Sequence, residues 1–231
     1  MYFLYKKLFA WAEVWPLAVA LIVYLLYKQK DGGIGIIIRL LGISLLLYAI
    51  ASYISNYTYR VPEPFKNNNI LYNLLMILKP LMIGTYLLRL KQLQQYKYLR
   101  VVLFLFILFT LFNFLFLGSV FVFSTYMVLA ESAVLLIFTH TFFLDAMVDD
   151  EIPLPLNHPA YYICIAISIL ESMNLFIYLF LFPLFYTNYE FAILISNILG
   201  IAHIIYGLTI AAGLYANREK RRFFQPTVLH E

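Results

Sequence analysis

The chain has 231 residues, of which 64% are hydrophobic and only 12% are charged, and its formal net charge is +4. Soluble globular domains carry about 25% charged residues, so this composition excludes a soluble domain and predicts a polytopic membrane protein whose main partner is the lipid bilayer. The basic residues stand at the ends of apolar segments rather than in one patch, so we expect no nucleic-acid partner.

Seven apolar segments meet the length that a bilayer core requires, which is about 20 mostly apolar residues per helix. In chain order they cover residues 9–27, 34–55, 69–90, 99–118, 120–144, 159–185 and 188–214. The first has a basic start but no small-residue cleavage site, so we interpret it as a retained helix rather than a signal peptide. The sequence therefore predicts an all-α fold, a single seven-transmembrane-helix bundle over 1–217 with a short basic cytoplasmic tail over 218–231.

The break between the fourth and fifth segments is the weakest one in the chain. Only Gly118 and Ser119 interrupt the apolar sequence from 99 to 144, which is far too long for a single span. We therefore expect a tight hairpin at this point. Connections as short as this one join antiparallel neighbours, which is typical of a compact helix bundle.

The basic residues also indicate the orientation, because cytoplasmic loops hold the excess of Lys and Arg. With the amino end outside, the inner side holds the larger group: Lys28, Lys30, Arg89, Lys91, Lys97, Arg100, Arg218, Lys220, Arg221 and Arg222. The outer side holds the smaller group: Lys6, Lys7, Arg60 and Lys66. We therefore expect the N-terminus outside and the C-terminus inside.

Three of the apolar segments carry a charged residue near mid-membrane depth. Lys79 lies near the middle of the third segment, and Glu131 and Glu171 lie at similar depth in the fifth and sixth. A charge at the bilayer centre costs at least about 2.5–3.5 kcal/mol, so the economical arrangement is an interior cluster with Lys79 between the two glutamates. If one carboxyl is protonated, that cluster is neutral.

Polar residues at helical spacing extend this interior face to other segments. Tyr72, Met76 and Lys79 share one side of the third segment, and His203 lies in a stripe of small residues in the last one. The candidate residues for a ligand or proton site are Lys79, Glu131, Glu171, His203, Asn73 and Ser168. Two interpretations stay open: a functional polar site, or a packing device that fixes the register of the helices.

Sequence motifs for catalysis or cofactor binding are missing from the chain. There is no Gly-x-Ser-x-Gly, no His-Glu-x-x-His and no phosphate loop. The last segment has no lysine to form a Schiff base with retinal, and the histidines are spread too widely for a zinc site. We therefore expect no catalytic residues, no metal and no cofactor.

Four stretches occur in a characteristic order: "WPLAVALIVYLLYK" at the start, "YNLL" opening the third segment, "ES" within the fifth and "SNILGIAHIIYGL" in the last. In this order the chain resembles a family of small seven-helix inner-membrane proteins of Bacteroidota. The resemblance implies a multi-pass protein of the cell inner membrane. It supplies no catalytic residues and no activity.

Three functional hypotheses follow from the sequence. The first is a non-enzymatic integral membrane module, either a sensor or an accessory subunit of a membrane complex, with a partner membrane protein or a second copy of the chain and a small-molecule or lipid ligand. The second is a small-solute or proton-coupled transporter, because Lys79, Glu131, Glu171 and His203 can exchange protons at mid-membrane. The third is an intramembrane lipid-modifying enzyme that uses Glu131 and Lys79 as an acid–base pair.

Overall fold

Apolar sequence forms helix almost throughout the computed structural model, which describes residues 9–27, 33–57, 67–148, 158–181 and 189–223. These ranges contain no strand, because a helix satisfies every backbone hydrogen bond within one segment, as hydrocarbon surroundings require. The α-helices are α2 (Trp15–Tyr27), α3 (Ile34–Asn56), α4 (Asn69–Leu87), α5 (Lys97–Phe112), α6 (Thr125–Val148), α7 (Pro159–Phe176) and α9 (Tyr189–Phe223). A 3₁₀ turn, η3 (Lys91–Gln95), precedes α5, and the π-helical turns η4 (Asn113–Leu117) and η5 (Ile177–Leu181) extend α5 and α7.

Six helical segments are long and apolar enough to cross a membrane. They are Ile34–Asn56, Asn69–Leu87, Lys97–Leu117, Thr125–Met147, Pro159–Leu181 and Glu190–Ala216. The chain is therefore an integral, multi-pass membrane protein. The seventh helix, α2, has 13 residues, which at 1.5 Å per residue gives a length of about 20 Å.

The start of α2 at Trp15, rather than near residue 9, has a cause in the sequence. Pro16 has no N–H to donate to the carbonyl of Ala12, and a proline is best accommodated in the first turn of a helix, where that N–H has no helical partner. The residues before it, Trp11–Val14, form turns instead, with hydrogen bonds from Ala12 N to Phe9 O and from Val14 N to Trp11 O.

Two other boundaries differ from the expected segments. The connection before α6 is longer than Gly118 and Ser119 alone, and α6 begins at Thr125 after Ser124, whose Oγ accepts a hydrogen bond from Met127 N. At the other end of the chain α9 continues to Phe223, so the expected tail over 218–231 begins as helix. Residues 224–231 lie outside the described part.

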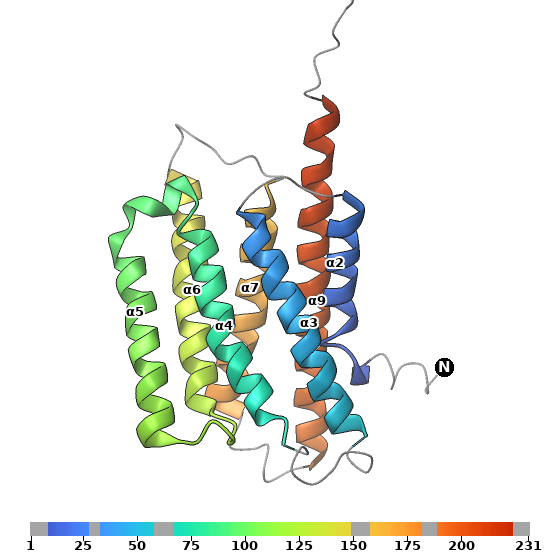
Figure 1. Ribbon diagram of the computed structural model, residues 1–231, viewed down its shortest axis with the longest axis vertical. Coiled ribbons are helices and arrows are strands. Elements are labelled where there is room, and N and C mark those ends of the chain that lie inside the picture. The colour runs from blue at the N-terminus through green and yellow to red at the C-terminus, as the bar shows by residue number, and fades with distance from the viewer. Residues whose placement is uncertain (1–8, 28–32, 58–66, 149–157, 182–188, 224–231) are drawn as a thin grey trace, which may run out of the picture.

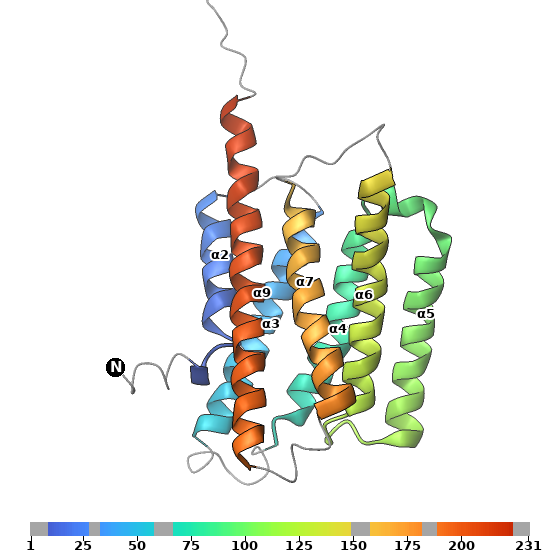
Figure 2. The same cartoon turned by 180° about the vertical axis from the view of Figure 1, so that it is seen from behind.

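The helices form a ring. In space α2 packs on α9, α9 on α7, α7 on α6, α6 on α4, α4 on α3, and α3 returns to α2 (Figures 1 and 2). Helix α5 lies outside this ring against α6 and α4 (Figure 1). Only 22% of the most apolar stretch of α5 is buried, against 56% for α6. Most of α5 therefore faces lipid, and the interior of the ring is shared by the other helices.

One close contact sets the distance between α9 and α2. A Cβ on Gly207 would lie 2.5 Å from Pro16 Cβ and 2.8 Å from the Pro16 carbonyl carbon. The two backbones therefore meet where no side chain separates them, as is common between membrane helices.

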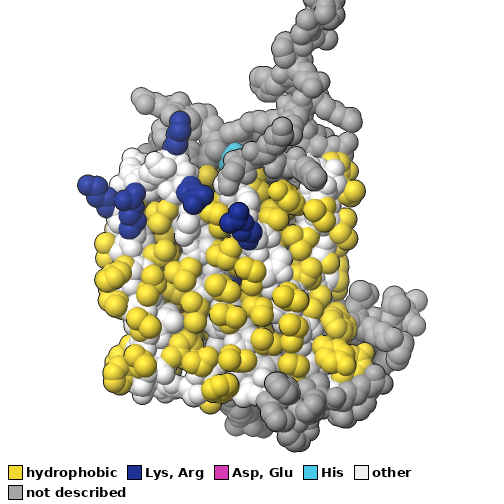
Figure 3. All heavy atoms as spheres, viewed as in Figure 1, with side chains coloured by type: hydrophobic (Ala, Val, Ile, Leu, Met, Phe, Trp, Pro, Cys, Tyr) yellow, Lys and Arg dark blue, Asp and Glu magenta, His cyan; other side chains and the backbone are white. Residues whose placement is uncertain are grey.

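The surface separates into an apolar middle and a basic end. Figure 3 shows apolar side chains over the length of the bundle and Lys and Arg side chains gathered toward one end. We call this the basic end; it is formed by the C-terminus of α4, η3 and the N-terminus of α5. The described basic residues there are Arg89, Lys91, Lys97 and Arg100.

Candidate functional site

A buried charge cluster lies inside the ring. Lys79 of α4 is 7% exposed, Glu131 of α6 is 2% exposed and Glu171 of α7 is 1% exposed. The Lys79 ammonium contacts the Glu131 carboxylate directly, and its Nζ lies 3.4 Å from Glu171 Oε1. The structure therefore brings together Lys79, Glu131 and Glu171 from separate helices, with one cation between two carboxyl groups.

The two glutamates have different surroundings. Glu171 Oε2 accepts hydrogen bonds from Ser132 Oγ at 2.8 Å and from Asn174 Nδ2 at 3.1 Å, in addition to the contact with Lys79. For Glu131, Lys79 is the sole partner within the described residues. Glu171 is thus a fixed carboxylate in a polar network, whereas Glu131 retains capacity to accept further hydrogen bonds.

A cavity of about 270 Å³ lies beside the cluster. Helices α3, α4, α6, α7 and α9 contribute to its wall. Its lining residues are Glu13, Tyr48, Asn69, Tyr72, Leu75, Met76, Lys79, Phe123, Val128, Glu131, Asn174, Tyr178, Leu199 and His203. Lys79 and Glu131 therefore face this cavity, whereas Glu171 does not line it.

A second cavity, of about 290 Å³, leads away from the first. It shares Glu13, Tyr72 and Leu199 with the first cavity. The Tyr72 hydroxyl donates a hydrogen bond to Glu13 Oε2 at 3.1 Å at this shared boundary. The rest of its wall includes the C-terminal turn of α3 and Ser196 near the start of α9, both at the end of the bundle opposite the basic end.

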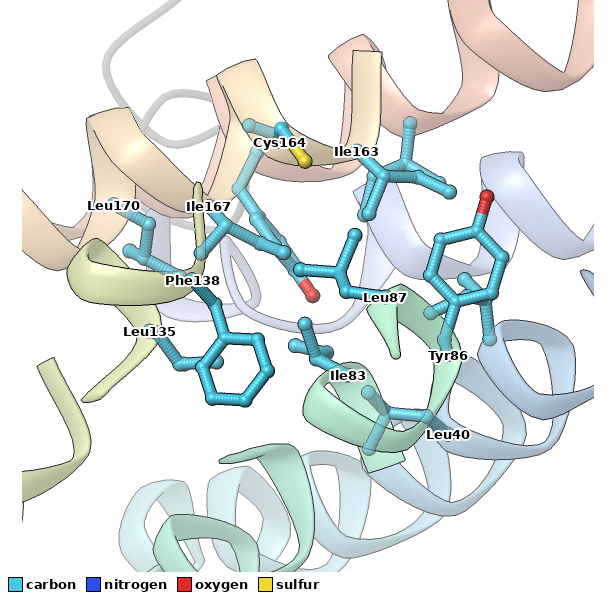
Figure 4. Close-up of a cluster of buried hydrophobic side chains, with 14 of the residues drawn as sticks. Leu40, Ile83, Tyr86, Leu87, Leu135, Phe138, Ile163, Cys164, Ile167 and Leu170 are labelled. Atoms are coloured by element: carbon cyan, nitrogen blue, oxygen red, sulfur yellow. The ribbon is translucent and has the colours of Figure 1, made fainter. Parts of the chain in front are cut away.

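Apolar side chains pack together on the other side of the cluster. Beyond Lys79, apolar side chains from α3, α4, α6 and α7 interleave, as Figure 4 shows. The fully buried ones in this packed half are Leu40, Ile83, Leu87, Leu135, Phe138, Ile163, Cys164, Ile167 and Leu170. The charge cluster therefore marks the boundary between a hollow half and a packed half of the bundle.

His203 lies on the wall of the first cavity, where α9 faces α3. Its Nδ1 is 3.0 Å from the carbonyl oxygen of Leu199, one turn earlier in the helix. The ring meets Tyr48 edge to face, with centroids 5.7 Å apart. A proton on Nδ1 would satisfy the Leu199 carbonyl and leave Nε2 as an acceptor. The structure thus places His203 in the same cavity as Lys79 and Glu131.

Asn73 and Ser168 occupy other places. The Asn73 amide donates to the carbonyl oxygens of Val120 and Val122 at 2.7 and 2.8 Å, which fixes the connection between α5 and α6. Ser168 Oγ donates to Thr139 Oγ1 at 3.0 Å and joins α7 to α6. Neither residue lines the cavity. Both act as contacts between elements.

Several cavity residues are absent from the candidates that the sequence suggests. The main ones are Glu13, Tyr48 and Tyr178. Glu13 carries a usable signal, since it is an acid within the first apolar segment. Tyr178 stands in η5, and π-helical turns are frequent at functional sites. Nothing in the sequence distinguishes Tyr48 from the many other tyrosines of the chain.

A further buried carboxyl group, apart from the charge cluster, lies at the basic end. Asp145 of α6 is 3% exposed, and its Oδ1 accepts hydrogen bonds from Gln95 Nε2 at 2.9 Å and from the Tyr96 hydroxyl at 2.8 Å. The hydrogen bond to Asp145 raises the pKa of Tyr96 above its ordinary value, so the hydroxyl remains the donor. This contact ties the α4–α5 connection to α6 and takes no part in the cavity.

Comparison with known proteins adds no family or relative. No protein-family model, curated protein or solved structure matches the chain. The functional argument therefore depends on the geometry of the cavity and the charge cluster.

Proposed function

We propose that this integral membrane protein is a binding module of the sensor or accessory-subunit type, located in the inner membrane of the cell, whose central cavity binds a small molecule. The observation that supports this proposal is the cavity beside Lys79 and Glu131. An ion pair that only fixes the register of the helices needs no such space, because the interior of a helix bundle is otherwise close-packed.

The size of the cavity supports a ligand. Its volume of about 270 Å³ is several times the roughly 30 Å³ that one water occupies in the liquid. Ligand pockets of drug-sized molecules start at about 300 Å³. A metabolite of a few heavy atoms, or a chain of waters, matches this space.

The asymmetry of the bundle favours sensing over transport. The cavities extend from the cluster toward one end, and the fully buried apolar side chains of the packed half close the other. By the positive-inside rule the basic end faces the cytoplasm, so we propose that the cavity is reached from the outer side. A ligand there would contact α3, α4, α6 and α9 together and could change how they pack.

A proton-coupled transporter is the second candidate, favoured by a specific observation. Lys79, Glu131 and His203 line one cavity, so three titratable groups are in reach of the same solute. Transport would require the packed half to open, and pH-dependent uptake into liposomes that Glu131→Gln abolishes would support it. Unchanged uptake in that variant would exclude this candidate.

The first experiment is mass spectrometry of the whole protein, purified gently from its own membrane, to score bound small molecules and partner chains together. Val128→Phe fills the cavity from α6, because Val128 is 4% exposed and lies on its wall. Ile137→Phe is the matched control, since Ile137 lies on the same helix and is 41% exposed. We expect a bound molecule that is lost in Val128→Phe and retained in Ile137→Phe.

Two outcomes would contradict the proposal. One is occupancy that Val128→Phe does not change, because the molecule would then lie elsewhere. The other is robust turnover of a lipid or solute by the purified chain, which would make it an enzyme.

A further inference from the structure

The cavity has an acidic and aromatic wall, and from it we infer that the ligand is a small organic cation, an amine or a quaternary ammonium. This inference rests on the proposed function and names its ligand class. Its basis is the charge of Glu13, the offset charge of Lys79 and two aromatic pairs in the cavity wall.

The charge of Lys79 is already offset within the protein. Its ammonium contacts Glu131 and lies 3.4 Å from Glu171 Oε1. Whether both carboxyl groups are ionised or one is protonated, at least one full negative charge balances the lysine. An anionic ligand therefore finds no free positive charge at this lysine, and it would also meet the Glu131 carboxyl on the same wall.

Within the described residues, the carboxyl group of Glu13 has no such ion pair. It accepts a hydrogen bond from the neutral Tyr72 hydroxyl, and no Lys or Arg pairs with it in the part of the chain that the structure describes. Glu13 also lies on the walls of both cavities, at their shared boundary. A cation that enters through the second cavity therefore meets this carboxylate before it reaches the cluster.

Aromatic rings complete the cation site. Tyr48 and Tyr72 form one pair, with centroids 6.0 Å apart, and Phe123 and Tyr178 form another at 5.7 Å. All four rings line the first cavity. Aromatic rings attract cations through their quadrupole, and cages of such rings are the usual recognition of quaternary ammonium groups. A carboxylate beside four rings thus favours an organic cation over a neutral solute.

The test uses the full chain in nanodiscs of phosphatidylglycerol, so that no lipid carries choline or another amine. The probe is radiolabelled choline, and the competitors are tetramethylammonium and 3,3-dimethyl-1-butanol, a neutral molecule of the shape of choline. We expect saturable choline binding that tetramethylammonium displaces and the neutral molecule does not. Equal competition by the neutral molecule would overturn the inference.

Variants then locate the site. We expect Glu13→Gln to weaken choline binding about tenfold or more, since the coulombic attraction between the carboxylate and the quaternary ammonium is lost, while Gln can still accept from Tyr72. Phe123→Leu should weaken binding several-fold, about the effect of one cation–aromatic contact. Glu190→Gln is the control, because Glu190 is exposed near the start of α9 and lines neither cavity. Unchanged affinity in both Glu13→Gln and Phe123→Leu would place choline elsewhere and overturn the inference.

The outcomes for the two proposals can be distinguished. A molecule that co-purifies with the protein and is lost in Val128→Phe would support the proposal of a binding module. If choline does not bind in the same protein, the inference that the ligand is a cation would be overturned. If no molecule co-purifies and choline does not bind, both proposals would be contradicted.

Discussion

The two halves of this bundle are built from the same helices but packed by different residues. Between Lys79 and the basic end, buried leucine, isoleucine and phenylalanine side chains pack together inside the ring (Figure 4). Between Lys79 and the opposite end, tyrosine, asparagine and glutamate side chains surround two cavities. Close packing is the default of a protein interior, so the hollow half is the part of the molecule that requires a functional explanation.

The charge cluster at the boundary should carry the largest single effect. Lys79→Met leaves Glu131 and Glu171 buried without a cation, and breaking a buried ion pair in this way lowers the free energy of unfolding by about 3–5 kcal/mol. Unfolding in mixed micelles measures the change. The double variant Lys79→Met, Glu131→Gln should recover part of the loss, because one of the two unpaired carboxyl groups is removed.

Arg39→Met is the matched control for this prediction, since Arg39 of α3 is an exposed basic residue in a spanning segment. It should change stability little. If Lys79→Met were equally mild, the cluster would contribute nothing to the fold.

Truncations should separate the two halves directly. Leu135→Ala in the packed half removes a fully buried side chain and leaves a new cavity, at a cost of about 3 kcal/mol. Met76→Ala in the hollow half enlarges a space that already exists, so only part of that penalty applies and we expect about 1 kcal/mol. Thermal unfolding of both variants in one detergent gives the comparison. Equal losses would mean that the cavity is closed when the protein is in detergent.

Helix α9, which contributes to the wall of the first cavity, packs closely on α2 through Gly207 and Pro16. In Gly207→Ala a Cβ meets the backbone of Pro16 at 2.8 Å, which must separate the two helices and costs about 1–3 kcal/mol. Gly42→Ala is the control, because a Cβ there has no atom within 4 Å and a mid-helix alanine is favourable by up to about 1 kcal/mol. In an unfolding assay, we expect Gly207→Ala to lower the free energy of unfolding and Gly42→Ala to raise it.

The sequence predicts much of this arrangement because the cost of exposing polar groups to lipid is large. The all-α fold follows from segments of bilayer length, and Lys79, Glu131 and Glu171 meet because each alone would be expensive in hydrocarbon. The cavity does not follow, since it depends on how far the helices stand apart. Asn73 shows the limit: helical spacing puts it near Lys79, but the carbonyls of the α5–α6 connection bind its amide.

The smallest expected effect lies at the basic end, outside both halves. Tyr96→Phe removes the hydrogen bond to Asp145 and should cost about 1 kcal/mol. Because the pKa of Tyr96 is raised in the folded protein, this contribution is complete below the unfolded value of about 10 and is lost as the pH rises through the folded value. The difference in melting temperature between the wild type and Tyr96→Phe should therefore stay constant from about pH 7 to 9 and shrink above about pH 10.

Tyr126→Phe, at a tyrosine that is 62% exposed, should show no such difference at any pH. A constant difference into strongly alkaline solution would mean that the ring of Tyr96, and not its hydroxyl, holds the α4–α5 connection to α6.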